Sequence, residues 1–186
     1  SIDAGAKVVT VITAGFREVS TDGAAAEQEL VELCQKHGVR LQGPNCLGIL
    51  NMHHRMNATF APSVPPPGKI SVISQSGALC VAILDWAAKE KLGMGKVISI
   101  GNKADLNEAD FLQALAEDKE TTVIASYLES IKDGNKFLRI AEEAAAIKPV
   151  LILKVGITQA GAKAASSHTG SLAGADIAYG AAFRRS

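Results

Sequence analysis

Two short segments carry side chains suited to binding and transferring a phosphoryl group, and each follows an apolar run that predicts a strand. The first, Ser74-Gln75-Ser76-Gly77, opens a predicted helix, where free backbone N–H groups and the helix dipole favour an anion. The second begins with Glu129, whose backbone the preceding strand would hold in place. The alternatives are that Ser76 only caps the helix and that Glu129 is a surface carboxylate.

A histidine, His168, lies in a long segment of small residues after the last predicted strand. Its neighbours are Ala, Ser, Thr and Gly, with Gly170 and Ser171 directly beyond it. Such residues build no core, but they let the backbone approach a ligand closely and can direct N–H groups at an oxyanion. A long loop without secondary structure is uncommon unless it is functional. A surface or core histidine is the alternative.

A doubly wound sheet would bring these segments together. With the flavodoxin-like strand order 2-1-3-4, the strands ending at Ile73, Leu128 and Val155 are neighbours, and ligands bind beyond their carboxyl ends. One imidazole nitrogen of His168 could then attack phosphorus while the other donates a hydrogen bond to Glu129. The hydroxyls and N–H groups of the first segment would receive the phosphoryl oxygens. We predict that His168 is transiently phosphorylated.

A serine hydrolase is a rival interpretation, because Ser76, Glu129 and His168 follow the chain order of an α/β-hydrolase triad. The elbow of such enzymes requires Gly-x-Ser-x-Gly, and neither glycine is in register around Ser76. Other segments give weaker indications of a functional site. The loop 101–105 contains a flexible glycine and a lysine and could line a pocket, but it is expected to be solvated. His53 and His54 are adjacent without the further ligands of a zinc site.

The rest of the pattern predicts an α/β protein whose sheet positions these loops. A strand over 7–13, a helix over 24–37 capped by Thr21 or Asp22, and a strand over 39–41 precede a proline-rich joint. After the joint, four strands alternate with helices, which predicts a parallel sheet covered on both faces. The strands are expected at 69–73, 96–100, 122–128 and 149–155, and the helices at 77–91, 107–117, 135–147 and from 173. The first of these helices is predicted to bury Leu79, Ala82, Ile83, Trp86 and Ala87.

Charge and composition exclude several classes of partner. Lys plus Arg and Asp plus Glu each number 19 among 186 residues, so the formal net charge is zero and nothing favours nucleic acid or an anionic membrane. No apolar run reaches the roughly 20 residues of a membrane span, and no signal peptide is recognisable. The cysteines form no metal or disulfide pattern. We expect a cytoplasmic protein without a metal site, and a chain cut from a longer one.

Several motifs resemble those of the NDP-forming acyl-CoA synthetases, relatives of the succinyl-CoA ligase α subunit. They occur in the same order and cover nearly the whole chain: GPNCLG at 43–48, NATFAP at 57–62, KISVISQSGAL at 69–79, GNKAD at 101–105, YLESIKDG at 127–134 and SSHTGSLAG at 166–174. The resemblance implies a partial Rossmann-like CoA-binding domain over 1–60, a proline-rich linker over 61–68 and a flavodoxin-like phosphohistidine domain over 69–186.

The same resemblance implies roles for individual residues. His168 matches the phosphorylated histidine, Glu129 its supporting carboxylate, and Ser74–Gly77 the start of the helix that points at the phosphate. Gly170 and Ser171 are expected to contact the phosphate as well. The implied coenzyme A contacts are Ile12, Thr13, Ala14, Gly15, Asn45 and Cys46, although many succinyl-CoA ligases carry Glu at the position of Ala14.

The family also implies substrates and partners that this chain does not hold alone. Acyl-CoA and phosphate would give an acyl phosphate, His168 would take its phosphoryl group, and ADP with Mg²⁺ on an ATP-grasp domain or subunit would receive it. No ATP-grasp domain is recognisable here, so the chain alone is expected to be inactive and the intact protein an oligomer. An alternative within the resemblance is an acyl-CoA-sensing module of a protein lysine acetyltransferase, although retention of His168 favours catalysis.

Overall fold

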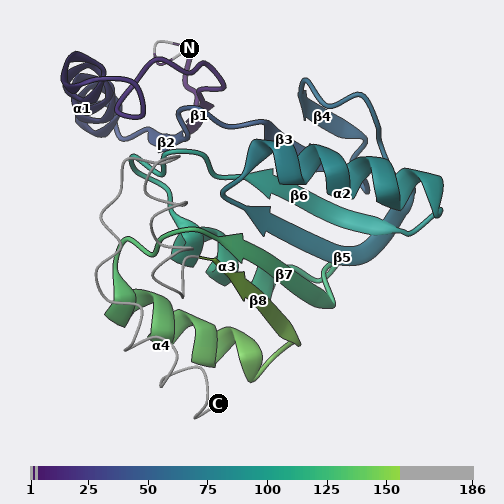
Figure 1. Ribbon diagram of the computed structural model, residues 1–186. Coiled ribbons are helices and arrows are strands. Elements are labelled where there is room, and N and C mark those ends of the chain that lie inside the picture. The colour runs from purple at the N-terminus through teal and green to yellow at the C-terminus, as the bar shows by residue number, and fades with distance from the viewer. Residues whose placement is uncertain (1, 3, 156–186) are drawn as a thin grey trace.

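The computed structural model describes residue 2 and residues 4–155, and these form two sheets with their helices (Figure 1). In chain order the elements are β1 (Val8–Thr10), α1 (Thr21–Lys36), β2 (Arg40–Gln42), β3 (Gly48–Asn51), β4 (Met56–Thr59), β5 (Pro67–Ser74), α2 (Gly77–Lys89), β6 (Met94–Ser99), α3 (Glu108–Glu117), β7 (Val123–Leu128), α4 (Gly134–Ala145) and β8 (Val150–Lys154). The predicted long loop around His168 and the helix predicted from 173 lie outside the described residues.

The larger sheet has six strands in the order β4-β3-β6-β5-β7-β8. Its last four strands are parallel, so the predicted order 2-1-3-4 and the α/β class are confirmed. β3 and β4 form an antiparallel hairpin at the edge of β6, with Ile49 opposite Ile98. The sequence predicts no hairpin here, and residues 48–59 fall within the expected CoA-binding domain over 1–60. The hairpin pairs with the larger sheet, and Leu50 is buried in the core that α2 covers.

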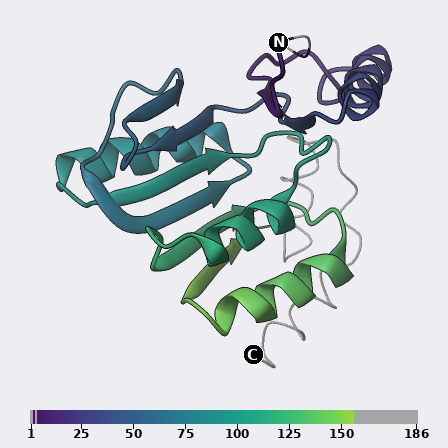
Figure 2. The ribbon, with the colours of Figure 1, turned by 180° about the vertical axis from the view of Figure 1, so that it is seen from behind.

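Helices cover both faces of this sheet, as predicted. Neighbouring residues of β5 point to opposite faces, Val72 towards α2 and Ile73 towards α3 and α4. Figure 2 shows α3 and α4 in front of the sheet when the molecule is seen from behind. The two cores are built mainly from aliphatic side chains, which agrees with the low aromatic content of 4%.

Helix α2 buries a different face from the predicted one. Cys80, Leu84 and Ala87 point into the core, whereas Trp86 is 57% exposed. Both sets of positions recur at three- and four-residue spacing, so periodicity alone does not distinguish them. Contacts with β5 and β6 decide which face of α2 is buried. Of the five residues predicted to be buried, only Ala87 is fully buried.

The smaller sheet contains β1 and β2, which are parallel and pack against α1. Ser20, rather than the predicted Thr21 or Asp22, caps α1, and its hydroxyl accepts a hydrogen bond from Gly23 N at 3.0 Å. Ser is among the best N-cap residues because its short side chain reaches the free N–H groups of the first turn. The helix therefore begins three residues earlier than predicted, at Thr21 instead of 24.

The proline-rich joint ends earlier than predicted, because β5 already begins at Pro67. A strand accepts proline at its first residue, where the missing N–H costs no ladder hydrogen bond. Residues 67 and 68 thus belong to the sheet, and Pro66 O accepts a hydrogen bond from Met94 N at 2.9 Å. The division of the chain into domains stays a prediction.

Hydrogen bonds connect the smaller sheet to the loop after β6. Asn102 N and Ala104 N donate to Pro44 O and Gly43 O, at 2.9 and 3.0 Å. Arg40 binds Asp105 with two nitrogens, at 2.8 and 2.9 Å. Burial raises the pKa of the Asp105 carboxyl, but the hydrogen bonds from Arg40 and from Leu41 N outweigh that effect and lower the pKa overall.

We expect Asp105→Asn to destabilise the protein at neutral pH. Because the folded-state pKa lies below the unfolded value of about 3.9, the carboxylate stabilises the fold above that pH and loses this effect as the pH falls through the folded-state pKa. Urea unfolding should show a loss of about 1–2 kcal/mol at neutral pH. The difference in unfolding free energy between the two proteins should begin to narrow below pH about 4, where the carboxyl of the unfolded chain becomes protonated, and should close only below the folded-state pKa. A difference in unfolding free energy that persists in acid would contradict this account, and so would an equal loss of stability in a control variant at the exposed Asp85.

Candidate functional site

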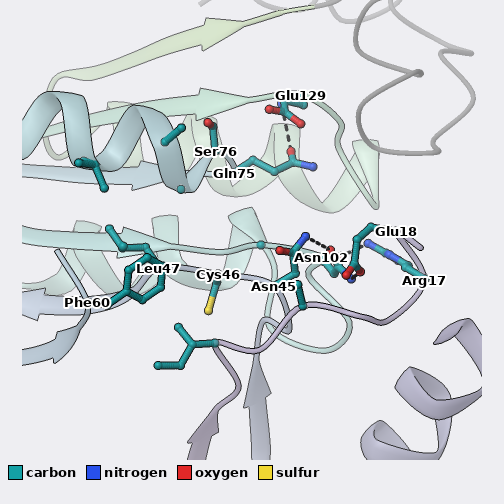
Figure 3. Close-up of a pocket in the computed structure, with 16 residues that line it drawn as sticks. Arg17, Glu18, Asn45, Cys46, Leu47, Phe60, Gln75, Ser76, Asn102 and Glu129 are labelled. Carbon is teal, nitrogen blue, oxygen red and sulfur yellow. Dashed lines mark hydrogen bonds between the residues drawn. The ribbon is translucent and has the colours of Figure 1, made fainter. Parts of the chain in front are cut away.

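A cavity of 480 Å³ lies where the carboxyl end of β5 faces the loops that follow β1 and β2. Figure 3 shows Gln75, Ser76 and Glu129 on one side and Asn45, Cys46 and Asn102 on the other. Lining residues come from both halves of the chain: Ile12, Ala14, Arg17, Glu18, Asn45, Cys46, Leu47, Phe60, Gln75, Ser76, Gly77, Ala78, Val81, Gly101, Asn102 and Glu129. The cavity is thus polar around Glu18 and Asn102 and apolar around Phe60 and Val81.

Eight of the predicted site residues line this one cavity: Ile12, Ala14, Asn45, Cys46, Gln75, Ser76, Gly77 and Glu129. Thr13, Gly15 and Ser74 do not line it. Ser74 is fully buried and shapes the turn beneath, because its hydroxyl donates to Ser76 O at 2.8 Å and accepts from Ser76 N at 3.2 Å. His168, Gly170 and Ser171 lie outside the described residues.

The start of α2 faces the cavity with its free N–H groups, since Gly77 and Ala78 belong to the lining. Ser76 is the N-cap, and its hydroxyl accepts a hydrogen bond from Leu79 N at 3.2 Å. The capping interpretation of Ser76 is therefore correct, and it leaves room for an anion at the same helix end. The φ of Ser76 is −93°, so the residue lacks the strained turn of a hydrolase nucleophile.

Gln75 holds the backbone that carries Glu129. Its side-chain oxygen Oε1 accepts hydrogen bonds from Glu129 N at 3.0 Å and Ser130 N at 3.1 Å, while Nε2 donates to Ser130 Oγ at 3.1 Å. Figure 3 shows the bond between Gln75 and Glu129 as a dashed line. On the opposite side of Glu129, Lys154 Nζ donates to its carbonyl at 3.0 Å. Two neighbouring strands therefore fix this carboxylate-bearing residue at the cavity, as the strand order predicts.

The polar end of the cavity was not predicted. Asn102 Nδ2 donates to Glu18 Oε2 at 2.6 Å and to Glu27 Oε2 at 2.8 Å, and Arg17 donates to Asn102 O. Burial raises the pKa of Glu18, but the hydrogen bonds from Asn102 and from backbone N–H groups, among them those of Gly15 and Phe16, lower it overall. The prediction of a solvated loop over 101–105 is wrong, since Asn102 is 8% exposed. No local pattern indicates this burial, because the partners Glu18 and Glu27 are 84 and 75 residues away in the sequence.

Cys46 lies at the cavity but is not suited to nucleophilic attack. Burial raises the pKa of its thiol to about 11, and Sγ donates a weak hydrogen bond to Val11 O at 3.5 Å. The thiolate is the reactive form of cysteine, and at neutral pH this thiol stays protonated.

Two other kinds of site are absent from the described residues. Among residues 2 and 4–155, no group of three or more His, Cys, Asp or Glu side chains is arranged to hold a metal ion. None of the helices described here combines the length and the apolar character that crossing a membrane requires.

Comparisons with known proteins agree with the fold. Residues 67–186 match the family described as the succinyl-CoA ligase like flavodoxin domain. Acetate–CoA ligase [ADP-forming] I of Archaeoglobus fulgidus is 53% identical over 176 residues, which are 95% of this chain and 26% of that protein. The α subunit of acetate–CoA ligase [ADP-forming] I of Pyrococcus furiosus is 46% identical over 182 residues, 98% of this chain and 39% of the subunit.

A solved structure also closely resembles this chain. The dinucleotide-forming acetyl-coenzyme A synthetase 1 of Ca. Korarchaeum cryptofilum, in complex with phosphate and ADP, superposes with a TM-score of 0.92 at 42% identity. The match covers 99% of this chain and 40% of that one.

The chain therefore belongs to the family of succinyl-CoA ligase-like flavodoxin domains, and the resemblance seen in the motifs is confirmed. It spans about a quarter to two-fifths of the length of the relatives named above. All of these relatives are CoA ligases or synthetases, so the comparisons do not support the acetyltransferase-linked sensor or the serine hydrolase.

Proposed function

We propose that this chain is the acyl-CoA- and phosphate-binding part of an ADP-forming acyl-CoA synthetase. One observation carries the proposal: Glu129, the start of α2 and the segments expected to contact coenzyme A line the same cavity. The similarity to ADP-forming acetate–CoA ligases supports it independently.

The proposed reaction proceeds in three steps. Inorganic phosphate attacks the acyl thioester, so that a C–O bond forms, the C–S bond breaks and coenzyme A leaves as the thiol. An imidazole nitrogen of His168 then attacks the phosphorus of the acyl phosphate, and the carboxylic acid departs as its carboxylate. Finally, an oxygen of the terminal phosphate of ADP attacks the phosphohistidine and regenerates the free imidazole.

The residues at the cavity would stabilise these steps. The N–H groups at the start of α2, with Ser76 and Gly77, bind phosphoryl oxygens, because a helix N-terminus favours anions. Glu129 accepts a hydrogen bond from the N–H of the other ring nitrogen of His168, which fixes the tautomer and stabilises the cation formed during transfer. Ile12, Ala14, Asn45 and Cys46, on the opposite wall, bind coenzyme A. Thr13, Gly15, Ser74, Gly170 and Ser171 remain predicted contacts.

ADP or ATP, with Mg²⁺, would bind on an ATP-grasp domain or subunit that this chain must meet in the intact protein, which we expect to be an oligomer. The match to an α subunit and to longer single chains supports such a partner, since this chain spans only part of each. The acyl group is proposed to be short, as in the acetate–CoA ligases.

Phosphoryl labelling tests the proposed function. The intact protein, incubated with radiolabelled phosphate and acetyl-CoA, or with labelled ATP and Mg²⁺, should acquire a phosphoryl group that is labile in acid and stable in base. His168→Ala should abolish this label, whereas replacement of the exposed His54 should leave it unchanged. Undiminished labelling of the His168→Ala variant would overturn the proposal.

A further inference from the structure

A buried ion pair lies behind Glu129 and does not line the cavity. Lys103 Nζ is 2.9 Å from Glu108 Oε2, and the two side chains are 2% and 1% exposed. Glu108 Oε2 accepts no hydrogen bond among the described residues, so this contact is electrostatic. Lys and Glu are almost never fully buried unless they are paired.

Lys103 directs its hydrogen bonds at the residue next to Glu129. Its Nζ donates to Ser130 O at 2.7 Å and to Ser130 Oγ at 3.2 Å. The same Ser130 Oγ accepts from Gln75, whose side-chain oxygen receives the N–H groups of Glu129 and Ser130. Glu108 extends the network, since its Oε1 accepts from Lys132 N at 2.8 Å. One ammonium group thus connects the loops after β5, β6 and β7.

Stability alone does not explain this arrangement. Removing two charges from water is unfavourable, and a well-packed apolar pair of similar volume is often equally stable or more stable. Lys103 also has a φ of +56°, a left-handed conformation that is unfavourable for a non-glycine residue. The burial of the charge and the left-handed backbone are both unfavourable, and both occur at Lys103, next to the proposed phosphohistidine site.

We propose that Lys103, with Glu108 as its counter-ion, is a positioning residue that holds Glu129 at the cavity through Ser130 and Gln75. This role rests on the proposed function of Glu129. Lys103 itself does not touch the substrate, because it does not belong to the cavity lining. Its effect should therefore depend on the Glu129 carboxylate being present.

A double-mutant cycle in the intact protein tests the proposal. Lys103→Met combined with Glu108→Leu removes both charges, so neither is left buried and unpaired. We expect this variant to fold and to phosphorylate His168 about 10-fold or more slowly, with an unchanged KM for coenzyme A. In a Glu129→Gln background the same pair of changes should slow the reaction less than about 2-fold, since residues that act as one unit are not additive. An equal loss in both backgrounds would overturn the proposal.

Amide hydrogen exchange provides a readout that does not depend on activity. The N–H groups of Glu129 and Ser130 should exchange about 10-fold faster or more in the charge-removed variant. Lys96→Met is the matched control, because Lys96 forms an ion pair with Asp118 at 2.7 Å towards the amino ends of the strands and should leave these amides protected. Unchanged exchange in the charge-removed variant would overturn the positioning role even if no phosphohistidine forms.

If the charge-removed variant does not fold, Ser130→Ala replaces it. This change removes the hydroxyl that links Lys103 to Gln75 and leaves both charges in place. We expect a smaller loss of phosphorylation rate, about 3-fold, which disappears in the Glu129→Gln background. An additive loss would contradict the proposal, whereas absence of label in the wild-type protein would overturn the proposed function instead.

Discussion

Glu129→Gln is expected to slow phosphorylation of His168 about 100-fold, which corresponds to about 2.7 kcal/mol of transition-state stabilisation. The backbone hydrogen bonds of residue 129, from its N–H to Gln75 and from Lys154 to its carbonyl, do not involve the carboxylate. Glutamine has the same shape, so these contacts should remain. The change removes the negative charge that is proposed to orient and stabilise the imidazole.

Single-turnover labelling of the intact protein measures this effect, and binding of coenzyme A should stay within about 3-fold of the wild type. Glu18→Gln is the matched control, because it removes a negative charge from the other end of the same cavity. We expect that control to lose less than about 10-fold in labelling rate. Equal losses for the two variants would mean that the net charge of the cavity matters and that Glu129 has no special role.

The parallel sheet could be predicted because its signals are local. Each apolar run ends at a turn residue, and each helix begins with a recognisable cap, as at Asn107 before α3. The chain order of strands and helices then leaves few topologies. The face that α2 buries could not be predicted, since Leu84 and Trp86 are equally apolar and only contacts with the sheet separate them. The same holds for the hairpin of β3 and β4, because the residues of β3 pair with residues of β6 that lie 45 to 49 positions further along the chain.

The site could be predicted in part, because the order of the strands follows from local signals. Gln75 and Glu129 directly follow neighbouring parallel strands, and topology alone brings them together. Asn102 and Lys103 could not be recognised as buried, because lysine in a loop is normally solvated and its partner here, Ser130, is 27 residues away. A desolvated charge becomes evident only when the groups that compensate it are placed in space.

The second large effect is expected at Gly101, where the loop after β6 passes the turn that carries Pro44 and Asn45. A Cβ at this position would lie 2.2 Å from Pro44 O and 2.5 Å from Asn45 O, and the φ of +55° is itself unfavourable for a side chain. Both obstructing atoms belong to the backbone, so no side-chain movement relieves the clash. Asn102 N donates a hydrogen bond to the same Pro44 O. To relieve the clash, the two loops that form the cavity wall must therefore move apart.

Three glycine-to-alanine variants separate strain from steric clash. Gly101→Ala combines both and should lower the free energy of unfolding by about 3 kcal/mol or more and weaken coenzyme A binding. Gly38→Ala keeps the strain, with a φ of +66°, but meets nothing within 4 Å, so about 1 kcal/mol is expected. Gly77→Ala has neither, because the nearest atom is 3.9 Å away, and should change stability by less than about 0.5 kcal/mol. Urea unfolding ranks the three variants, and a Gly101→Ala loss no greater than that of Gly38→Ala would refute the close approach of the two loops.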